Sequence, residues 1–351
     1  MKTPRPLRPF LSRRFARFLS RAVVALTAAT AGAATKPGEI VLGTILPSGT
    51  EQYRLLQALG QQWRKDTDGA VKLIIHPDGR LGGESDMVKK IGIGQLNAGL
   101  FSVVGLSEIS ADVTGLQLMP LTFRSWAEID HVREKMRPLL EARLRAKGFA
   151  VLCWADAGWV RFFSTELAVT PEDLRRMKTF VWAGSEAQIA IMKSIGCQPV
   201  ALETTDLLMG LQTKMITAAP LPPLIALAGQ IYGTARHMLD MNWCPIVGAV
   251  VVRTDVWEKI PPPLRTRLQA AAEETGKKIR AAGRSEDEES IRVMKKHGLT
   301  VHALPPNAAA QWEQLRDQVY PRVRGKLVPT DIFDAVQQHL RDFRATNPSA
   351  Q

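Results

Sequence analysis

The chain has 351 residues, of which 45% are hydrophobic and 23% are charged. This balance is typical of a globular protein and excludes a largely disordered one, while the length suits two domains of ~100–200 residues. The net charge is +12, but seven of the positive charges precede residue 22 with no acidic residue among them. The remaining +5 is modest, so we expect no nucleic-acid partner.

The basic N-terminal segment precedes a weakly apolar run at residues 22–34 that ends in small residues. This order is typical of a secretory signal. We therefore predict a signal peptide over residues 1–33 and a periplasmic protein. Sec export is favoured, and the adjacent Arg13 and Arg14 leave the twin-arginine route as the alternative. The apolar run is shorter than the ~20 residues that span a membrane.

Short apolar runs alternate with amphipathic segments along the rest of the chain, which predicts strands interleaved with helices. Such alternation is typical of the α/β class with largely parallel sheets. The predicted strands lie at residues 39–46, 71–77, 97–104, 149–156, 158–165, 178–184 and 246–252. The predicted helices include residues 82–94, 186–196, 204–214, 223–233 and 261–298, with two or three more near the C-terminus.

Three helix starts carry capping signals. Ser48 with Glu51, and Ser125 with Glu128, have the spacing of a capping box. Thr170 followed by Pro171 has the favoured order of a cap and a first helical proline. We expect Pro138 to break or kink the helix that begins after Ser125.

The sequence carries no motif of a known catalytic site. It lacks the HExxH zinc motif, the GxSxG nucleophile elbow and the phosphate-binding GxxxxGK[ST] loop. Its six histidines and three cysteines are scattered without metal-ligand spacing. We expect no enzyme, no cofactor and no metal, and an enzyme with a dispersed active site is the less favoured alternative.

Four segments in a consistent order resemble one protein family. They cover residues 76–99, 170–184, 210–223 and 258–275. In these segments the chain is similar to the periplasmic solute-binding subunits of tripartite ATP-independent periplasmic (TRAP) transporters, the DctP-like family. The resemblance extends from about residue 38 to residue 345.

The resemblance implies a two-lobed α/β fold with two mixed or parallel sheets, a hinge and a long lobe-spanning helix. It places lobe I at residues 38–156 plus 245–282 and lobe II at residues 157–244 plus 283–310. Residues 311–351 would form C-terminal helices packing on the lobes. It also implies a monomer that passes a small-molecule ligand to integral membrane TRAP permease subunits.

Several positions depart from the family pattern. Phe180 stands where the family places the arginine that grips the ligand's carboxylate, and Val160 where some members have a second arginine. Leu221 replaces an asparagine, Thr217 an aspartate, and Ser102 an acid of some members.

A carboxylate buried without a cation costs roughly 3–5 kcal/mol. The resemblance, with these departures, therefore predicts an apolar or aromatic ligand rather than a small dicarboxylate. A lipid or hydrophobe shuttle and a ligand sensor of the same fold are the alternatives, and aromatic side chains on strands are also common in cores. The predicted ligand-binding residues are Thr44, Ser102, Trp159, Phe162, Phe180, Trp182, Thr217, Leu221 and Trp243.

Overall fold

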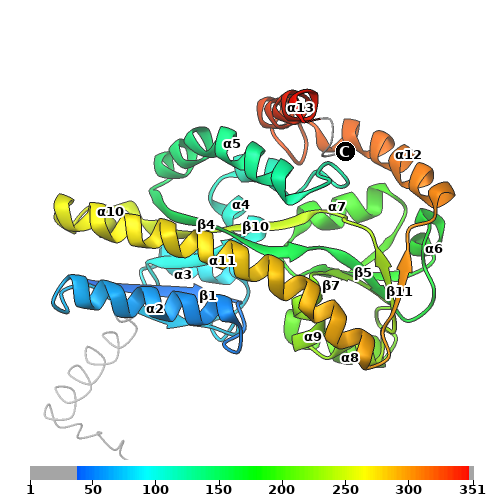
Figure 1. The fold of residues 1–351 in the computed structure, drawn as a ribbon, viewed down its shortest axis with the longest axis horizontal. Coiled ribbons are helices and arrows are strands. Elements are labelled where there is room, and N and C mark those ends of the chain that lie inside the picture. Colours follow the sequence, from blue (N-terminus) through cyan, green and yellow to red (C-terminus); the bar gives the residue numbers. More distant parts are fainter. Residues whose placement is uncertain (1–37, 348–351) are drawn as a thin grey trace, which may run out of the picture. The chain divides into compact units, whose positions relative to one another are not determined.

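The computed structural model describes residues 38–347, so the predicted signal peptide lies outside the described residues. These residues form two sheets with helices packed on their faces (Figure 1). The strand orders are β2-β1-β3-β10-β4 and β11-β9-β5-β8-β6-β7. Both sheets are mixed, and the fold is the predicted two-lobed α/β fold.

In the first sheet, β1 pairs in parallel with β2 and β3, whereas β10 runs antiparallel to β3 and β4. The central strand β10 is buried along nearly its whole length, as its unbroken apolar run predicts. The bounds of the strands are β1 Glu39–Thr44, β2 Lys72–His76, β3 Ala98–Ser102, β4 Phe149–Trp159 and β10 Pro245–Arg253.

In the second sheet, β6 pairs in parallel with β7 and β8, and β5 runs antiparallel to β8 and β9. The sequence prediction missed β7, β8, β9 and β11. These strands are short, and β7, β9 and β11 also carry exposed residues, so they present no long apolar run. The bounds are β5 Arg161–Ser164, β6 Lys178–Trp182, β7 Gln198–Leu202, β8 Ala218–Leu221, β9 His237–Asp240 and β11 Thr300–Ala303.

The helices cover the faces of the sheets and also form the C-terminal part of the chain. The longer helices are α2 Glu51–Asp66, α3 Glu84–Gly92, α5 Trp126–Ala146, α7 Glu186–Ser194, α11 Pro262–Lys296, α12 Pro306–Val323 and α13 Thr330–Thr346. The short ones are α4 Val103–Ile109, α6 Pro171–Arg175, α8 Leu207–Gln212, α9 Pro223–Ala228 and α10 Thr254–Trp257, with 3-10 turns η1 Ala111–Leu116, η2 Thr204–Asp206 and η3 Ile231–Gly233. No helix within residues 38–347 combines the length and apolarity needed to cross a membrane.

The helix starts correct two local predictions. The cap of α2 is Thr50, whose side chain accepts from the backbone N–H of Tyr53, and not Ser48. Helix α5 runs through Pro138 without ending there. The cap at Thr170 is confirmed, because it forms a full capping box with Asp173.

Three chain segments connect the two sheets: β4 into β5, β9 into β10, and α11. The first two are bonded to each other, since Val160 N–H donates to the Cys244 carbonyl at 2.9 Å and Trp243 N–H donates to the Val160 carbonyl at 3.1 Å. Helix α11 packs on β4 and α2 beside the first sheet and on α9 beside the second (Figure 1). The long helix therefore spans both lobes, as predicted.

Close packing of α11 on β4 depends on glycine. A Cβ atom placed on Gly276 would lie 2.6 Å from the Cβ of Cys153 and 2.9 Å from the Trp154 carbonyl oxygen. A Cβ atom on Gly283 would lie 2.7 Å from the Asp156 carbonyl oxygen. These separations are too short for any side chain, so the two glycines set the helix-to-sheet distance.

We expect Gly276→Ala to destabilise the protein by about 1–3 kcal/mol, because the added methyl forces α11 away from β4. Inside a helix, a change from glycine to alanine usually increases the stability of the protein by about 1 kcal/mol, so the expected loss has the opposite sign. Chemical denaturation measures the difference. The control is Ser285→Ala at an exposed position of the same helix, which should give a small gain. Equal effects of the two substitutions would contradict the packing account.

Candidate ligand-binding site

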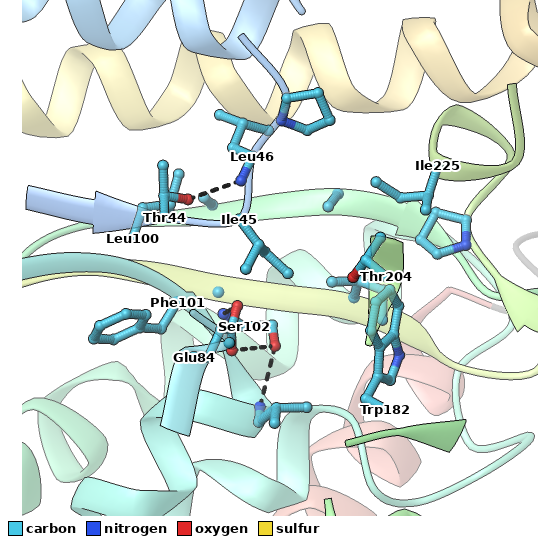
Figure 2. Close-up of a pocket in the computed structure, with 18 of the residues that line it drawn as sticks. Thr44, Ile45, Leu46, Glu84, Leu100, Phe101, Ser102, Trp182, Thr204 and Ile225 are labelled. Atoms are coloured by element: carbon cyan, nitrogen blue, oxygen red, sulfur yellow. Dashed lines mark hydrogen bonds between the residues drawn. The ribbon is translucent and has the colours of Figure 1, made fainter. Parts of the chain in front are cut away.

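A pocket of about 120 Å³ lies between the two sheets. Residues at the carboxyl ends of five strands line it, namely β1, β3, β6, β7 and β8 (Figure 2). This is the place where open α/β sheets bind their ligands. The pocket is therefore the candidate ligand-binding site.

The first sheet contributes the segment that follows β1 and the end of β3. Thr44, Ile45 and Leu46 lie along one side, and the Thr44 hydroxyl accepts from the Leu46 N–H at 3.1 Å (Figure 2). Phe101 and Ser102 close β3 beside them. Apart from the two hydroxyls, the side chains of these five residues are apolar.

The second sheet contributes the opposite wall. Trp182 ends β6, Thr204 follows β7, and Ile225 lies on α9 just after β8 (Figure 2). The rims of the two walls are in contact, since a Cβ atom on Gly184 would lie 3.0 Å from the Ser85 hydroxyl and one on Gly83 would lie 3.4 Å from a Glu203 carboxylate oxygen.

The charged side chains of the lining are all acidic. They are Glu84, Asp156 and Glu203, and within residues 38–347 neither lysine, arginine nor histidine lines this pocket. Glu84 is buried, and its carboxylate accepts from the Ser102 N–H, the Ser102 hydroxyl and the Gly105 N–H, each at 2.8 Å. Burial nevertheless raises the pKa of Glu84 above its usual value. The site therefore offers a solute no cation.

Asp156 is neutralised from behind the pocket floor. Its side chain is fully buried, and its carboxylate accepts from Arg133 of α5 at 3.0 Å and from Arg284 of α11 at 2.6 Å. Both arginines also bond to Asp130. Two carboxylates and two guanidinium groups thus form a cluster without net charge, whose arginines do not line the pocket.

A second, smaller cavity of about 40 Å³ adjoins the pocket. Gln117, Trp182 and Ile246 line both spaces. Phe180 and Trp243 line the second cavity only, and among the described residues its lining contains no charged side chain.

Five of the nine predicted site residues reach these two spaces. Thr44 and Ser102 line the pocket, Trp182 lines both spaces, and Phe180 and Trp243 line the second cavity. Phe180 and Trp182 lie on one face of β6, with their rings edge to face at 4.9 Å, as the two-residue spacing predicts.

The other four predicted residues lie outside both spaces. Phe162 stacks on Trp312 in the core. Trp159 packs against Trp126, and Leu221 is buried in the core of the second sheet. The Thr217 hydroxyl accepts from the backbone N–H of Lys178 and holds the start of β6.

Sequence reasoning missed several lining residues. Glu84 looks like an ordinary acidic residue in the first turn of a helix, and its burial depends on β3 packing over it. Gln52 and Gln117 lie outside the recognised motifs, yet each is 2% exposed and lines the pocket. The Nε2 atom of Gln52 is buried with no hydrogen-bond partner among residues 38–347. The family resemblance, which named Ser102 as a site residue, pointed to this region without identifying these three residues.

The carboxylate of Asp287 lies at the crossing between the sheets. It accepts from the Trp159 N–H at 3.3 Å, and a Cβ atom on Gly158 would lie 2.5 Å from it. Gly158 has φ +96°, a conformation that favours glycine. Burial raises the pKa of Asp287 to about 7, although the nearby Arg161 acts in the opposite direction.

Comparison with known proteins identifies the family. The model of "Bacterial extracellular solute-binding protein, family 7" (DctP) matches residues 42–326. The chain belongs to this DctP family. It is therefore a TRAP-type periplasmic solute-binding protein and not an enzyme.

Individual relatives of this DctP-family chain are distant. It is 22% identical to the C4-dicarboxylate-binding periplasmic protein DctP of Rhodobacter capsulatus over 75% of this chain and 79% of that one. It is 25% identical to the 2,3-diketo-L-gulonate-binding periplasmic protein YiaO of Escherichia coli K12 over 67% and 72%.

Solved structures share the fold. A TRAP periplasmic solute-binding protein of Xanthobacter autotrophicus Py2 with bound β-D-galacturonate superposes with a TM-score of 0.78 at 18% identity, covering 86% of this chain and 99% of that one. One from Desulfovibrio salexigens with bound orotic acid has a TM-score of 0.77 at 18% identity, covering 89% and 99%. At these identities the similarity concerns the fold alone.

We expect Asp156→Asn to destabilise this DctP-family protein by roughly 3–5 kcal/mol, because Arg133 and Arg284 are then left with Asp130 as the one carboxylate that they share. Urea unfolding measures the loss. The matched control is Glu134→Gln, which removes an exposed carboxylate 3.8 Å from the same arginine and should cost less than about 1 kcal/mol. Similar losses for the two variants would contradict the importance of the buried cluster.

We expect Asp287→Asn to change the pH dependence of stability. The pKa of Asp287 is about 7 in the folded chain, against about 3.9 in an unfolded one. The folded wild type therefore retains a proton that the unfolded chain releases, and its stability falls as pH rises from 4 to 7. An asparagine at this position does not ionise, so the stability of the variant lacks this fall with pH.

Urea unfolding from pH 4 to pH 8 measures the free energy of unfolding of both proteins. Relative to the wild type, the free energy of unfolding of Asp287→Asn should rise by roughly 3–4 kcal/mol across this range. Glu274→Gln, on the exposed side of the same helix, should leave the profile unchanged. A constant difference between Asp287→Asn and the wild type at every pH would show that Asp287 does not titrate in this window.

Proposed function

We propose that this protein captures a small uncharged solute of largely apolar character and delivers it to the integral membrane subunits of a TRAP transporter. The solute would occupy the pocket between the two sheets. The observation that carries the proposal is the lining, in which every charged side chain is a carboxylate.

The energetic consequence follows from burial. A solute carboxylate in this pocket would lie beside Glu84 and Glu203 with no cation to pair with. An unpaired buried charge costs roughly 3–5 kcal/mol, which is two to three decades or more of affinity. A neutral solute avoids this penalty and gains about 25 cal/mol for each Å² of apolar surface removed from water.

The family resemblance supports the same conclusion from a second direction. By that resemblance, Phe180 and Val160 occupy positions where family members carry arginines. Both side chains line the second cavity, which is bounded by uncharged residues. The place where a carboxylate would be expected is therefore apolar in this chain.

The relatives point to acids, since galacturonate, orotic acid and C4-dicarboxylates appear in their names. These comparisons give no support to an apolar ligand, and the proposal rests on the lining of this chain and on its departures from the family pattern. The proposed site contains Thr44, Ser102, Trp182, Phe180 and Trp243. It leaves out Trp159, Phe162, Thr217 and Leu221, which line neither space.

We also infer the organisation predicted from the sequence: export by Sec after removal of residues 1–33, action as a monomer, and two lobes. Lobe I would contain residues 38–156 and 245–282, and lobe II residues 157–244 and 283–310. Residues 311–351 would pack on both lobes. Strand β4 continues in the first sheet to Trp159, so the division at residue 156 falls within a strand.

A pair of molecules that differ only in charge tests the proposal. We expect benzamide to bind at least a hundredfold more tightly than benzoate at pH 7.5, because only benzoate brings an unpaired charge into the pocket. Isothermal titration calorimetry measures both. Galacturonate and succinate serve as further anionic probes. Binding of benzoate or either of these acids as tight as that of benzamide would overturn the proposal.

Native mass spectrometry of protein purified from the periplasm without refolding is the complementary measurement. Denaturation of the complex should release a neutral molecule. Release of an organic acid would mean that a cation outside the described lining pairs with it, and would contradict the assignment of an uncharged solute.

A further inference from the structure

Trp182 lines both the pocket and the second cavity. Three residues line both spaces, and of these Gln117 is held by a hydrogen bond from the Val247 N–H at 3.3 Å while Ile246 belongs to β10. Trp182 is the largest of the three, is half-buried, and ends β6 just before Gly184, whose φ is +81° (Figure 2). Trp182 is therefore the largest side chain that the two spaces share.

The second cavity has the chemistry of a site for a hydrocarbon tail. Phe180, Trp243 and Met192 contribute apolar surface, the polar side chains are those of Gln117 and Gln188, and no charged residue in the described part of the chain lines it. The chain thus places an uncharged space directly beyond the wall of its ligand pocket.

We propose that the second cavity is a subsite for the apolar tail of the solute, and that Trp182 sets how long a tail the protein accepts. This inference rests on the proposed function, because it assumes that the pocket binds an uncharged solute. Solutes that fit the pocket bind with Trp182 in place. Longer tails require the indole to move aside or to be replaced by a smaller side chain.

Linear primary alcohols from 1-butanol to 1-decanol provide the test, measured by calorimetry on the mature protein. In the wild type we expect affinity to rise about fourfold with each methylene until the tail reaches Trp182, and then to stop rising. In Trp182→Ala the rise should continue through at least one further methylene. Trp182→Phe keeps a ring at this position and should shift the limit less.

Trp182→Ala also creates space of its own, so a second variant must separate the two effects. Gln188 lines the second cavity and not the pocket, and Gln188→Trp would fill the cavity. In the double variant we expect the length limit to return toward that of the wild type. A double variant that keeps the longer limit would overturn the subsite, because the tail would then use only the space left by the indole.

The outcomes distinguish this inference from the proposed function. If the wild type binds alcohols but Trp182→Ala, folded as judged by circular dichroism, has the same length limit, only the role of Trp182 is overturned. If neither protein binds any alcohol while benzoate binds, both the subsite and the proposed function are overturned.

Discussion

Asp156 imposes the constraint on which the arrangement of the site depends. Its carboxylate is fully buried, so it requires the guanidinium groups of Arg133 and Arg284 within hydrogen-bonding distance. These arginines lie on α5 and α11, and both helices must therefore approach β4 closely. Gly276 and Gly283 permit that approach on the α11 side. The floor of the pocket, the long helix and the first sheet are consequently fixed relative to one another by one ionic cluster.

The same cluster determines the electrostatics of the pocket. Two guanidinium groups face two carboxylates, those of Asp130 and Asp156, so the cluster presents no net positive charge to a solute above the floor. Arg284 is further engaged by the Trp126 ring at 4.6 Å. The two arginines that bind Asp156 are thus committed to structure, and the other carboxylates of the lining are those of Glu84 and Glu203.

Structural features that depend on residues close together in the sequence could be predicted, whereas features that depend on distant segments could not. The continuous apolar run of β10 and the cap at Thr170 are local features, and both were predicted correctly. The edge strand β7 carries no such run and was missed. The pocket's acidic character could not be predicted, because Glu84 becomes a buried lining residue only when β3 and α4 fold over it. Likewise, both Trp182 and Phe162 were predicted as ligand-binding residues because they are aromatic residues on predicted strands. Trp182 lines the pocket, whereas Phe162 packs in the core.

Selectivity in such a pocket arises mainly from exclusion. Burial of apolar surface contributes about 25 cal/mol per Å², and this contribution hardly distinguishes one apolar solute from another of similar size. An unpaired charge costs roughly 3–5 kcal/mol, so a single ionised group on the solute outweighs the burial of several methylenes. Specificity is a difference between two affinities, and a penalty on the wrong solute creates it as effectively as an attraction for the right one. Under the proposed function, the uncharged lining around Phe180 and Trp182 would therefore exclude acids without any added polar contact.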